Sequence, residues 1–259
     1  MTLGAAARDG RLVTCVALAI ATVVSWWLMA RSAAVMHAMA GDPVMLGLAR
    51  AMMAPEATGP YLGASALMWI VMMAAMMTPA ALPITLVFMR LDRERGETRA
   101  GSGIAFAAGY LTAWFGFALV ATLVQWLLHR AALLHGMMMV AGPVLAGATL
   151  LVAGIFQLTP IKEACLAHCR TPMGFLLGHW QPGPSGAFRM GLHHGTYCLG
   201  CCWALMLIMF AAGVMSVAAM AVLTVFILAE RVLPGRWATH LPGVVLIAWG
   251  AWTLVAALA

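Results

Sequence analysis

Uninterrupted apolar runs of about twenty residues recur along this chain, and they restrict its fold more than any other feature. The first run covers residues 12–30, and the last covers residues 241–258. One helix of this length and composition crosses the hydrocarbon core of a bilayer. Strands of a membrane barrel instead alternate polar and apolar residues over short segments. The runs therefore predict an all-α fold, a polytopic transmembrane helical bundle.

The charged residues agree with this fold class. They make up 8% of the 259 residues, whereas a soluble domain carries roughly a quarter. The net charge of +6 comes from basic residues that lie between apolar runs, where they orient a membrane protein and do not indicate nucleic acid. The sequence contains no Walker A loop. We therefore expect the lipid bilayer as a partner, and neither nucleic acid nor a nucleotide.

We expect about seven helices in a single transmembrane domain covering residues 1–259, with six helices as the alternative. The stretch 187–230 would be about 65 Å long as one helix, so we expect a break where Gly213 ends one helix and Ser216 caps the next. The Pro and Gly residues between residues 31 and 61 argue against a long regular element there. The expected helices cover residues 12–30, 62–89, 104–128, 137–158, 187–213, 216–230 and 241–258.

The Lys and Arg residues indicate the orientation of the bundle. With seven spans and a cytoplasmic N-terminus, every Lys and Arg except Arg31, Arg50 and Arg130 lies on the cytoplasmic side. This distribution follows the positive-inside rule and favours seven spans over six. It also places the connector 159–192 in the cytoplasm, where Thr159–Pro160 is expected to begin a short helix.

The segment HHGTYCLGCCW, residues 193–203, concentrates soft metal ligands in an apolar helix. His194, Cys198 and Cys202 are spaced four residues apart and so share one helix face, with Cys201 beside them. A histidine at membrane depth needs a partner or a function. A single buried Cys is usually a small hydrophobic residue, but four ligand-type side chains on one face predict a metal site.

A second cluster of ligand-type residues lies in KEACLAHCR, residues 162–170. Cys165, His168 and Cys169 fall within about one helical turn, on the same predicted side of the membrane as the first cluster. Thiolates and imidazoles in this arrangement could complete or relay a metal site. A surface amphipathic helix with incidental thiols explains the pattern equally well.

A third cluster consists of methionines in MWIVMMAAMMTP, residues 68–79. Met72 and Met76 are four residues apart, as are Met73 and Met77, so each pair occupies one face of a helix. Met commonly fills gaps between packed helices. If these thioethers face the thiols of residues 198–202, they would form a soft path or complete a site.

The ligand types favour one metal over others. Thiolate and thioether ligands select Cu(I), whereas zinc uses Cys and His and does not typically use Met. We therefore expect copper as Cu(I), with zinc as the second choice. Carboxylates are scarce near the clusters: Glu163 is the only nearby one, and Glu230 beside Arg231 is interpreted as an interfacial ion pair.

Three segments resemble a bacterial family of integral membrane proteins described as predicted metal-binding and of unknown function. They are WIVMMAAMMTP, QLTPIKEACLAHCRTPMGFLLGHW and GAFRMGLHHGTYCLGCCWALMLIMFAAGVMS, and the resemblance covers about residues 60–250. It implies a multi-pass protein of the bacterial inner membrane with a role compatible with copper handling. By motif position, it places the metal on His194, Cys198, Cys201 and Cys202, with Cys165, His168, Cys169 and the methionines as neighbours.

The leading functional hypothesis is a Cu(I)-binding protein that accepts, holds or transfers copper for a membrane copper enzyme or another metalloprotein complex, and that is not itself an enzyme. The main alternative is a thiol-disulfide oxidoreductase, because Cys198 and Cys201 form a CxxC motif. Haem binding through histidines 168, 193 and 194, or a structural subunit in which Cys and Met only pack, are further alternatives.

Overall fold

The computed structural model describes residues 3–96, 101–136, 139–233 and 235–259. Within these residues the chain is almost entirely helical, which confirms the predicted all-α bundle. The helices are α1 (Leu3–Ala38), α2 (Pro43–Met52), α3 (Thr58–Glu94), α4 (Ser102–Arg130), α5 (Pro143–Gln157), α6 (Pro160–Arg170), α7 (Pro172–Gly178), α8 (Gly183–Ala212), α9 (Val217–Val232) and α10 (Trp237–Leu258). A short antiparallel hairpin precedes α5, and its two strands, β1 (Leu134–His135) and β2 (Val140–Ala141), have two residues each.

Among the described residues, five helices are long and apolar enough to cross a membrane: α1, α3, α4, α8 and α10. A sixth span results if α5 and α6 count as one, although they meet at an angle of 66°. The last predicted span, α9, has 16 residues and is therefore about 24 Å long, shorter than a hydrocarbon core of about 30 Å. The seven apolar helices are thus present, but α5 and α9 do not each have the length of a full span.

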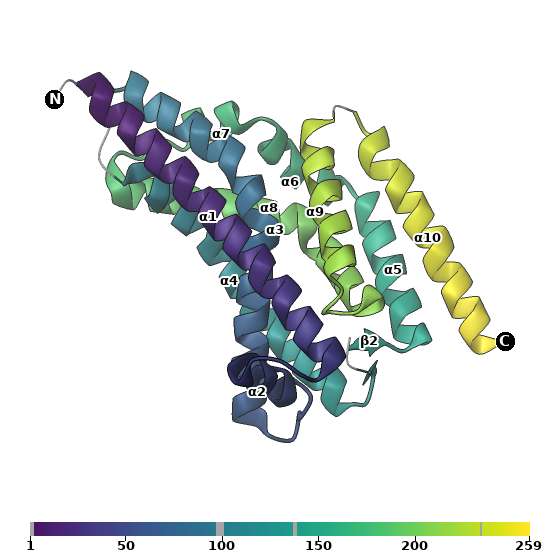
Figure 1. Ribbon diagram of the computed structural model, residues 1–259. Coiled ribbons are helices and arrows are strands. Elements are labelled where there is room, and N and C mark those ends of the chain that lie inside the picture. Colours follow the sequence, from purple (N-terminus) through teal and green to yellow (C-terminus); the bar gives the residue numbers. More distant parts are fainter. Residues whose placement is uncertain (1–2, 97–100, 137–138, 234) are drawn as a thin grey trace.

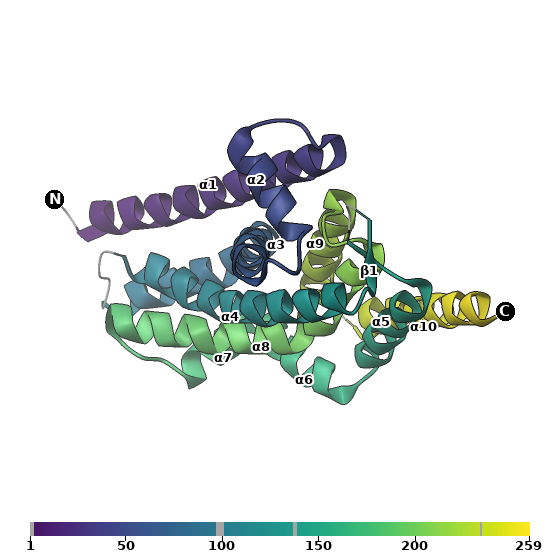
Figure 2. The same ribbon diagram turned by 90° about the horizontal axis from the view of Figure 1, so that it is seen from below.

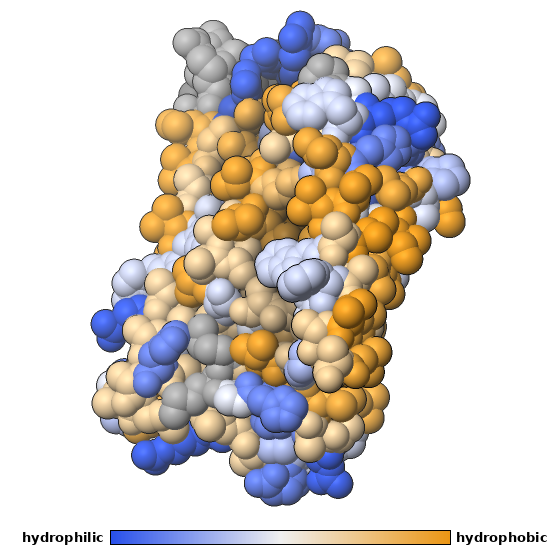
Figure 3. Space-filling view, turned by 90° about the vertical axis from the view of Figure 1, so that its right-hand side faces the viewer, coloured by the Kyte–Doolittle hydropathy of each residue, from blue (hydrophilic) through white to orange (hydrophobic). Residues whose placement is uncertain are grey.

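The helices run between two ends of the molecule (Figure 1). The N-terminus, α6, α7 and the C-terminal end of α9 lie at one end, here named the α6 end, whereas α2 and the hairpin lie at the other. The side of the molecule seen in Figure 3 has a broad apolar middle, and its hydrophilic residues gather toward the two ends. This distribution is what a bilayer around the bundle requires.

The bundle is layered. Figure 2 shows α3 end-on between α1 and α4, with α8 on the far side of α4 and with α5 and α10 together at one edge. Cys198, Cys201 and Cys202 lie midway along α8, which packs against both α4 and α6.

The prolines of the predicted loops begin helices. Asp42 caps α2, because its Oδ1 accepts hydrogen bonds from the backbone nitrogens of Val44 (2.9 Å) and Met45 (3.3 Å), and Pro43 occupies the first turn. The expectation of irregular structure over residues 31–61 is therefore wrong for α2 and for the start of α3. Pro172 likewise begins α7, which the sequence did not predict.

Two predicted helix boundaries are confirmed. Gly213, with φ of 95°, follows the end of α8, and the Ser216 hydroxyl accepts a hydrogen bond from the Ala219 nitrogen (3.3 Å) at the start of α9. Thr159 caps α6 in the same way, accepting from the Lys162 nitrogen at 3.3 Å. These caps fix where the cysteine-bearing helices begin and end.

Glycines bring the backbones of α4 and α8 into direct contact. A Cβ atom on Gly109 would overlap the carbonyl oxygen of Phe188, and one on Gly191 would overlap that of Phe106. Small residues allow this close approach between membrane helices. The same contact fixes the rotation of α8 about its axis, so it determines which α8 side chains face α4.

The variant Gly109→Ala is expected to destabilise the protein by about 1–3 kcal/mol, because the added methyl group forces the α4 and α8 backbones apart. Gly116→Ala, on the same helix, is the matched control, because its Cβ meets nothing within 4 Å. The control should stabilise α4 by about 0.5–1 kcal/mol. Denaturant unfolding in detergent micelles measures both, and equal stabilities would contradict the close packing.

Glycines also join α5 to α10. A Cβ on Gly154 would lie 2.8 Å from the carbonyl oxygen of Gly243, and a Cβ on Gly250 would lie 2.8 Å from that of Gly147. The two pairs hold α10 against α5, while most of the other α10 side chains remain exposed. Such exposed apolar side chains are suited to lipid contact.

Candidate metal centre

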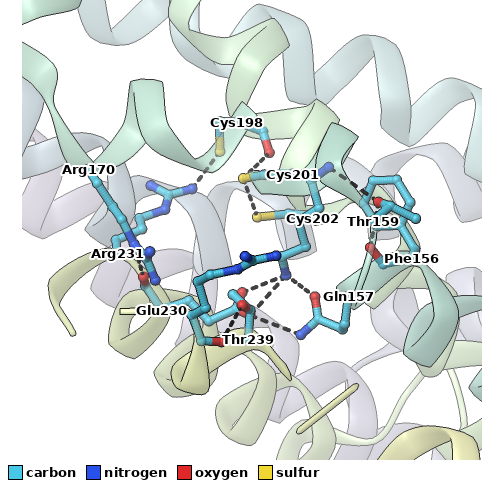
Figure 4. A network of polar contacts seen from close by, with 12 residues as sticks. Phe156, Gln157, Thr159, Arg170, Cys198, Cys201, Cys202, Glu230, Arg231 and Thr239 are labelled. Carbon is cyan, nitrogen blue, oxygen red and sulfur yellow. Dashed lines mark hydrogen bonds and ion pairs between the residues drawn. The ribbon is translucent and has the colours of Figure 1, made fainter. Parts of the chain in front are cut away.

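Three cysteines of α8 lie on one buried face. Cys198, Cys201 and Cys202 are all exposed by 1% or less. The sulfur atoms of Cys201 and Cys202 are 3.2 Å apart, and the Cys201 thiol donates to the carbonyl oxygen of Cys198 at 3.1 Å. Figure 4 shows these side chains together on the inner side of α8. The glycines of α8 pack directly on α4. This contact turns the cysteine-bearing face of α8 toward the core.

A fourth thiol comes from α6. The Cys169 side chain lies close to those of both Cys198 and Cys201 and packs against the same core. We name this group, Cys169, Cys198, Cys201 and Cys202, the thiol cluster. The helices α6 and α8 thus supply sulfur atoms from positions about thirty residues apart in sequence. The predicted role of Cys169, to complete or relay the site on α8, requires such a contact.

Two further residues contact the thiol cluster, and sequence reasoning missed both. Arg231 of α9 donates from Nη2 to the Cys198 sulfur at 2.6 Å and from Nη1 to the Ala80 carbonyl of α3 at 3.1 Å. The hydroxyl of Tyr110 on α4 lies 2.9 Å from the same sulfur. Since an arginine is charged at all relevant pH values, Arg231 brings a fixed positive charge to Cys198. The one sequence signal for these contacts was Tyr110, a tyrosine within an apolar helix.

A buried ion pair holds α6 against α9. Lys162 Nζ and Glu230 Oε2 are 2.8 Å apart, and both side chains are exposed by 1% or less. Gln157 Nε2 donates to the other Glu230 oxygen at 2.9 Å, and Arg170 Nε donates to the Glu230 carbonyl at 2.9 Å. The expected Glu230–Arg231 pair is therefore wrong: Glu230 turns toward Lys162, and Arg231 turns toward Cys198 (Figure 4).

His194 lies one helical turn before Cys198 and is 1% exposed. Its ring contacts Tyr110 and Phe175, with ring centroids at 6.1 Å and 5.1 Å. Within the described part of the chain, its Nδ1 has no hydrogen-bond partner. An unpaired polar atom in a buried position is costly. An ion that binds the Nδ1 lone pair, or an acceptor for a proton on Nδ1, would therefore stabilise the site.

The predicted methionines belong to the same core. Met72, Met73, Met76 and Met77 are each exposed by 1% or less and form one contiguous buried cluster with Cys198, Cys201 and Cys202. The Ala80 carbonyl that binds Arg231 lies one turn after Met76 on α3. The methionines and the thiols thus share one core, and a soft path from the thioethers to the thiols stays a prediction.

Two predicted residues lie apart from the thiol cluster. His168 stacks on Tyr197, with ring centroids 4.1 Å apart, and its Nδ1 bonds the Ala164 carbonyl at 2.9 Å. The Cys165 sulfur lies 2.9 Å from where a Cβ on Gly200 would be. Gly200 is about 160° around α8 from Cys202 at 100° per residue, so Cys165 contacts a different face of that helix.

The thiol cluster is compact and is not arranged around a common point. Among the residues that the structure describes, no three His, Cys, Asp or Glu side chains surround a position as metal ligands do. Two thiolates on one tetrahedral zinc ion, at bonds of about 2.3 Å, would be about 3.8 Å apart. The separation of 3.2 Å between Cys201 and Cys202 is shorter, so these thiols would separate slightly to accept an ion.

Comparison with known proteins identifies the family of this chain. No curated protein and no solved structure matches the chain. The family PpoB2, described as "Copper chaperone", matches residues 66–253, which include the methionines of α3, all of α6 and all of α8. The match covers most of the chain, and the protein therefore belongs to the PpoB2 copper chaperone family.

Proposed function

We propose that this protein binds Cu(I) in the membrane and passes it to a copper enzyme or another metalloprotein. The observation that supports this proposal is the close grouping of four thiols, one from α6 and three buried ones from α8, against a core that also contains the α3 methionines. Sulfur ligands in an apolar, water-excluded position suit a soft monovalent ion. Cys198, Cys201, Cys202 and Cys169 would hold copper, with His194 as a nitrogen ligand.

The surroundings of the thiol cluster favour copper over zinc. The carboxylate of Glu230 is occupied by Lys162, and that of Glu163 is 2.6 Å from Arg236. These two carboxylates are therefore engaged elsewhere, whereas the α3 thioethers belong to the same buried core as the α8 thiols. Zinc remains the second choice, because it also binds cysteine and histidine.

Arg231 would balance the charge of the bound ion. Cu(I) held by two thiolates carries one net negative charge, which is costly in an apolar environment. The guanidinium group beside Cys198 compensates this charge within hydrogen-bond distance. In this role Arg231 is a positioning residue that contacts a ligand and does not bind the metal.

We further propose that the protein lies in a bacterial inner membrane with its N-terminus in the cytoplasm. α6, which carries Cys169 of the thiol cluster, then lies toward the cytoplasmic side, at the same end as α7 (Figure 1). Cytoplasmic thiols are kept reduced, and reduced thiols can bind Cu(I). We expect a carrier and no catalytic turnover.

One observation favours a second function, thiol-disulfide exchange. The Cys201 and Cys202 sulfurs are only 3.2 Å apart, and a guanidinium group contacts Cys198, as at reactive thiols. However, exchange requires a partner thiol to reach the sulfur atom, and these three side chains are exposed by 1% or less. Burial therefore favours metal holding over exchange.

Anaerobic loading of the purified full-length protein with Cu(I) tests the proposal. We expect copper to remain bound after desalting, and X-ray absorption at the copper edge to show a shell dominated by sulfur. Elemental analysis in the same sample distinguishes copper from zinc. Protein that retains no copper, or copper bound only by oxygen and nitrogen, would refute the thiol cluster as the site.

A further inference from the structure

Two exposed histidines form a pair at the α6 end. The rings of His179, which follows α7, and His193 on α8 have centroids 4.8 Å apart and lie nearly perpendicular, at 82°. We propose that His179 and His193 form a second, surface copper site that captures Cu(I) and passes it inward to His194 and the thiol cluster. This inference rests on the proposed function, because it supplies the entrance to that site.

The His179 ring is held in the tautomer that a metal ligand needs. Its Nδ1 lies 3.1 Å from the carbonyl oxygen of Phe175, and a carbonyl only accepts, so Nδ1 carries the proton. The lone pair of His179 is then on Nε2 and free for an ion. Metal-binding histidines usually have their second nitrogen fixed in this way.

The separation of the two rings suits a shared ion. Imidazole nitrogens bind first-row metals at about 2.0–2.1 Å, which puts two ring centroids about 5 Å apart for a bent pair and about 6 Å apart for a linear one. The observed 4.8 Å is close to the bent arrangement. Both side chains are exposed, so a copper donor can reach them.

A continuous row of side chains leads from this pair to the thiols. The Phe175 ring contacts His179, His193 and His194, with centroids at 5.0 Å, 5.5 Å and 5.1 Å. His194 is buried, has an unpaired Nδ1, and packs on Tyr110. The hydroxyl of Tyr110 in turn contacts the Cys198 sulfur at 2.9 Å.

This row resolves a difficulty of the thiol cluster. Its α8 thiols are exposed by 1% or less, so a copper donor cannot contact them directly. An ion moving by exchange between ligands needs intermediate donors between solvent and the thiols. His179, His193 and His194 are the described side chains that supply them on this row, the first two exposed and the third buried.

The rate of copper loading tests the surface pair. Purified full-length protein is mixed anaerobically with a coloured Cu(I)–chelator complex, and the loss of its absorbance is followed by stopped flow. We expect His179→Ala/His193→Ala to slow loading by about tenfold or more. With one equivalent of Cu(I), the final copper content and the sulfur shell in X-ray absorption should stay unchanged, because the thiol cluster is intact.

The matched control is His37→Ala. His37 is exposed near the end of α1, and its Nδ1 bonds the Ala33 carbonyl at 3.0 Å, so it shares the exposure and the Nδ1 hydrogen bond of His179 but lies away from the α6 end. This variant should load at the wild-type rate. His179→Gln/His193→Gln, which keeps polar side chains of similar size, should load as slowly as the alanine variant.

A second readout detects the surface site itself. In Cys198→Ser/Cys202→Ser protein loaded with excess Cu(I), the copper should show nitrogen ligands whose number falls when His179 and His193 are also replaced, since only His194 then remains as a nitrogen donor on this row. Wild-type loading rates in the histidine variants, with copper still on sulfur, would overturn the surface site and leave the proposed function standing. Wild-type protein that binds no copper at all would overturn both.

Discussion

Replacing Cys198 and Cys202 with serine is expected to lower the Cu(I) affinity of the protein by more than about 100-fold. Loss of a residue that only orients a ligand typically costs 10–100-fold, and this variant removes two ligands and the sulfur that Arg231 and Tyr110 contact. Serine is nearly isosteric with cysteine, so the packing of α8 is retained. Anaerobic competition against a coloured Cu(I) chelator measures the affinity.

The control for this variant is Cys15→Ser. Cys15 lies on α1, outside the core that contains the thiol cluster, and it is the cysteine farthest in sequence from the others. It should retain wild-type affinity. An unchanged affinity in the Cys198→Ser/Cys202→Ser variant would mean that copper binds elsewhere, and the thiol cluster would then be a packing feature.

Replacing Glu230 with alanine is expected to reduce the free energy of unfolding by about 3–5 kcal/mol. The substitution leaves the Lys162 ammonium group buried beside Gln157 without its counter-charge. Lys162→Met/Glu230→Leu removes both charges and should recover most of that loss, since a buried ion pair is often replaceable by apolar residues. Denaturant unfolding in detergent micelles gives the comparison.

An exposed ion pair supplies the control for Glu230. Arg90 and Glu94 on α3 are also 2.8 Å apart, but their side chains are exposed by 65% and 52%. Glu94→Ala should leave the free energy of unfolding nearly unchanged, because exposed pairs contribute little. Equal stabilities of Glu230→Ala and Glu94→Ala protein would show that water reaches the Lys162–Glu230 pair.

The Lys162–Glu230 pair also matters for the thiol cluster. It joins α6, which carries Cys169, to α9, in which Arg231 directly follows Glu230. Loss of the pair would therefore disturb two contacts of the thiols together. We interpret the buried charges as the element that brings α6 and α9 to a common position beside α8.

Short-range patterns were the part of this structure that the sequence predicted well. Apolar runs predicted the long helices, and the spacing of Cys198 and Cys202 predicted a shared face of α8, because both follow from the helical repeat. The Gly213–Ser216 break followed from capping chemistry. The region before α3 was misjudged because Pro43 was interpreted as a chain breaker, whereas a proline that follows a capping Asp also begins helices.

Contacts between helices were not predictable in the same way. Cys165 and Cys169 lie four residues apart on one side of α6, yet only Cys169 contacts the thiols of α8, because the docking of α6 decides which one does. Arg231 was interpreted as an interfacial charge. Its contact with Cys198 joins residues 33 positions apart, and a local sequence pattern does not reveal such a contact. Tertiary packing, which one sequence does not reveal, determines both.

The glycine pairing of α5 with α10 has a consequence for biosynthesis. α5 ends at Gln157 and α10 at Leu258, so about 100 residues are translated between them, which takes roughly 5–20 s at 5–20 residues per second. Throughout that interval Gly147 and Gly154 have no α10 backbone to pack against. Until α10 has left the ribosome, the contacts of α5 with α8 must therefore hold α5 in place. α10 then packs on α5 and completes that edge of the bundle.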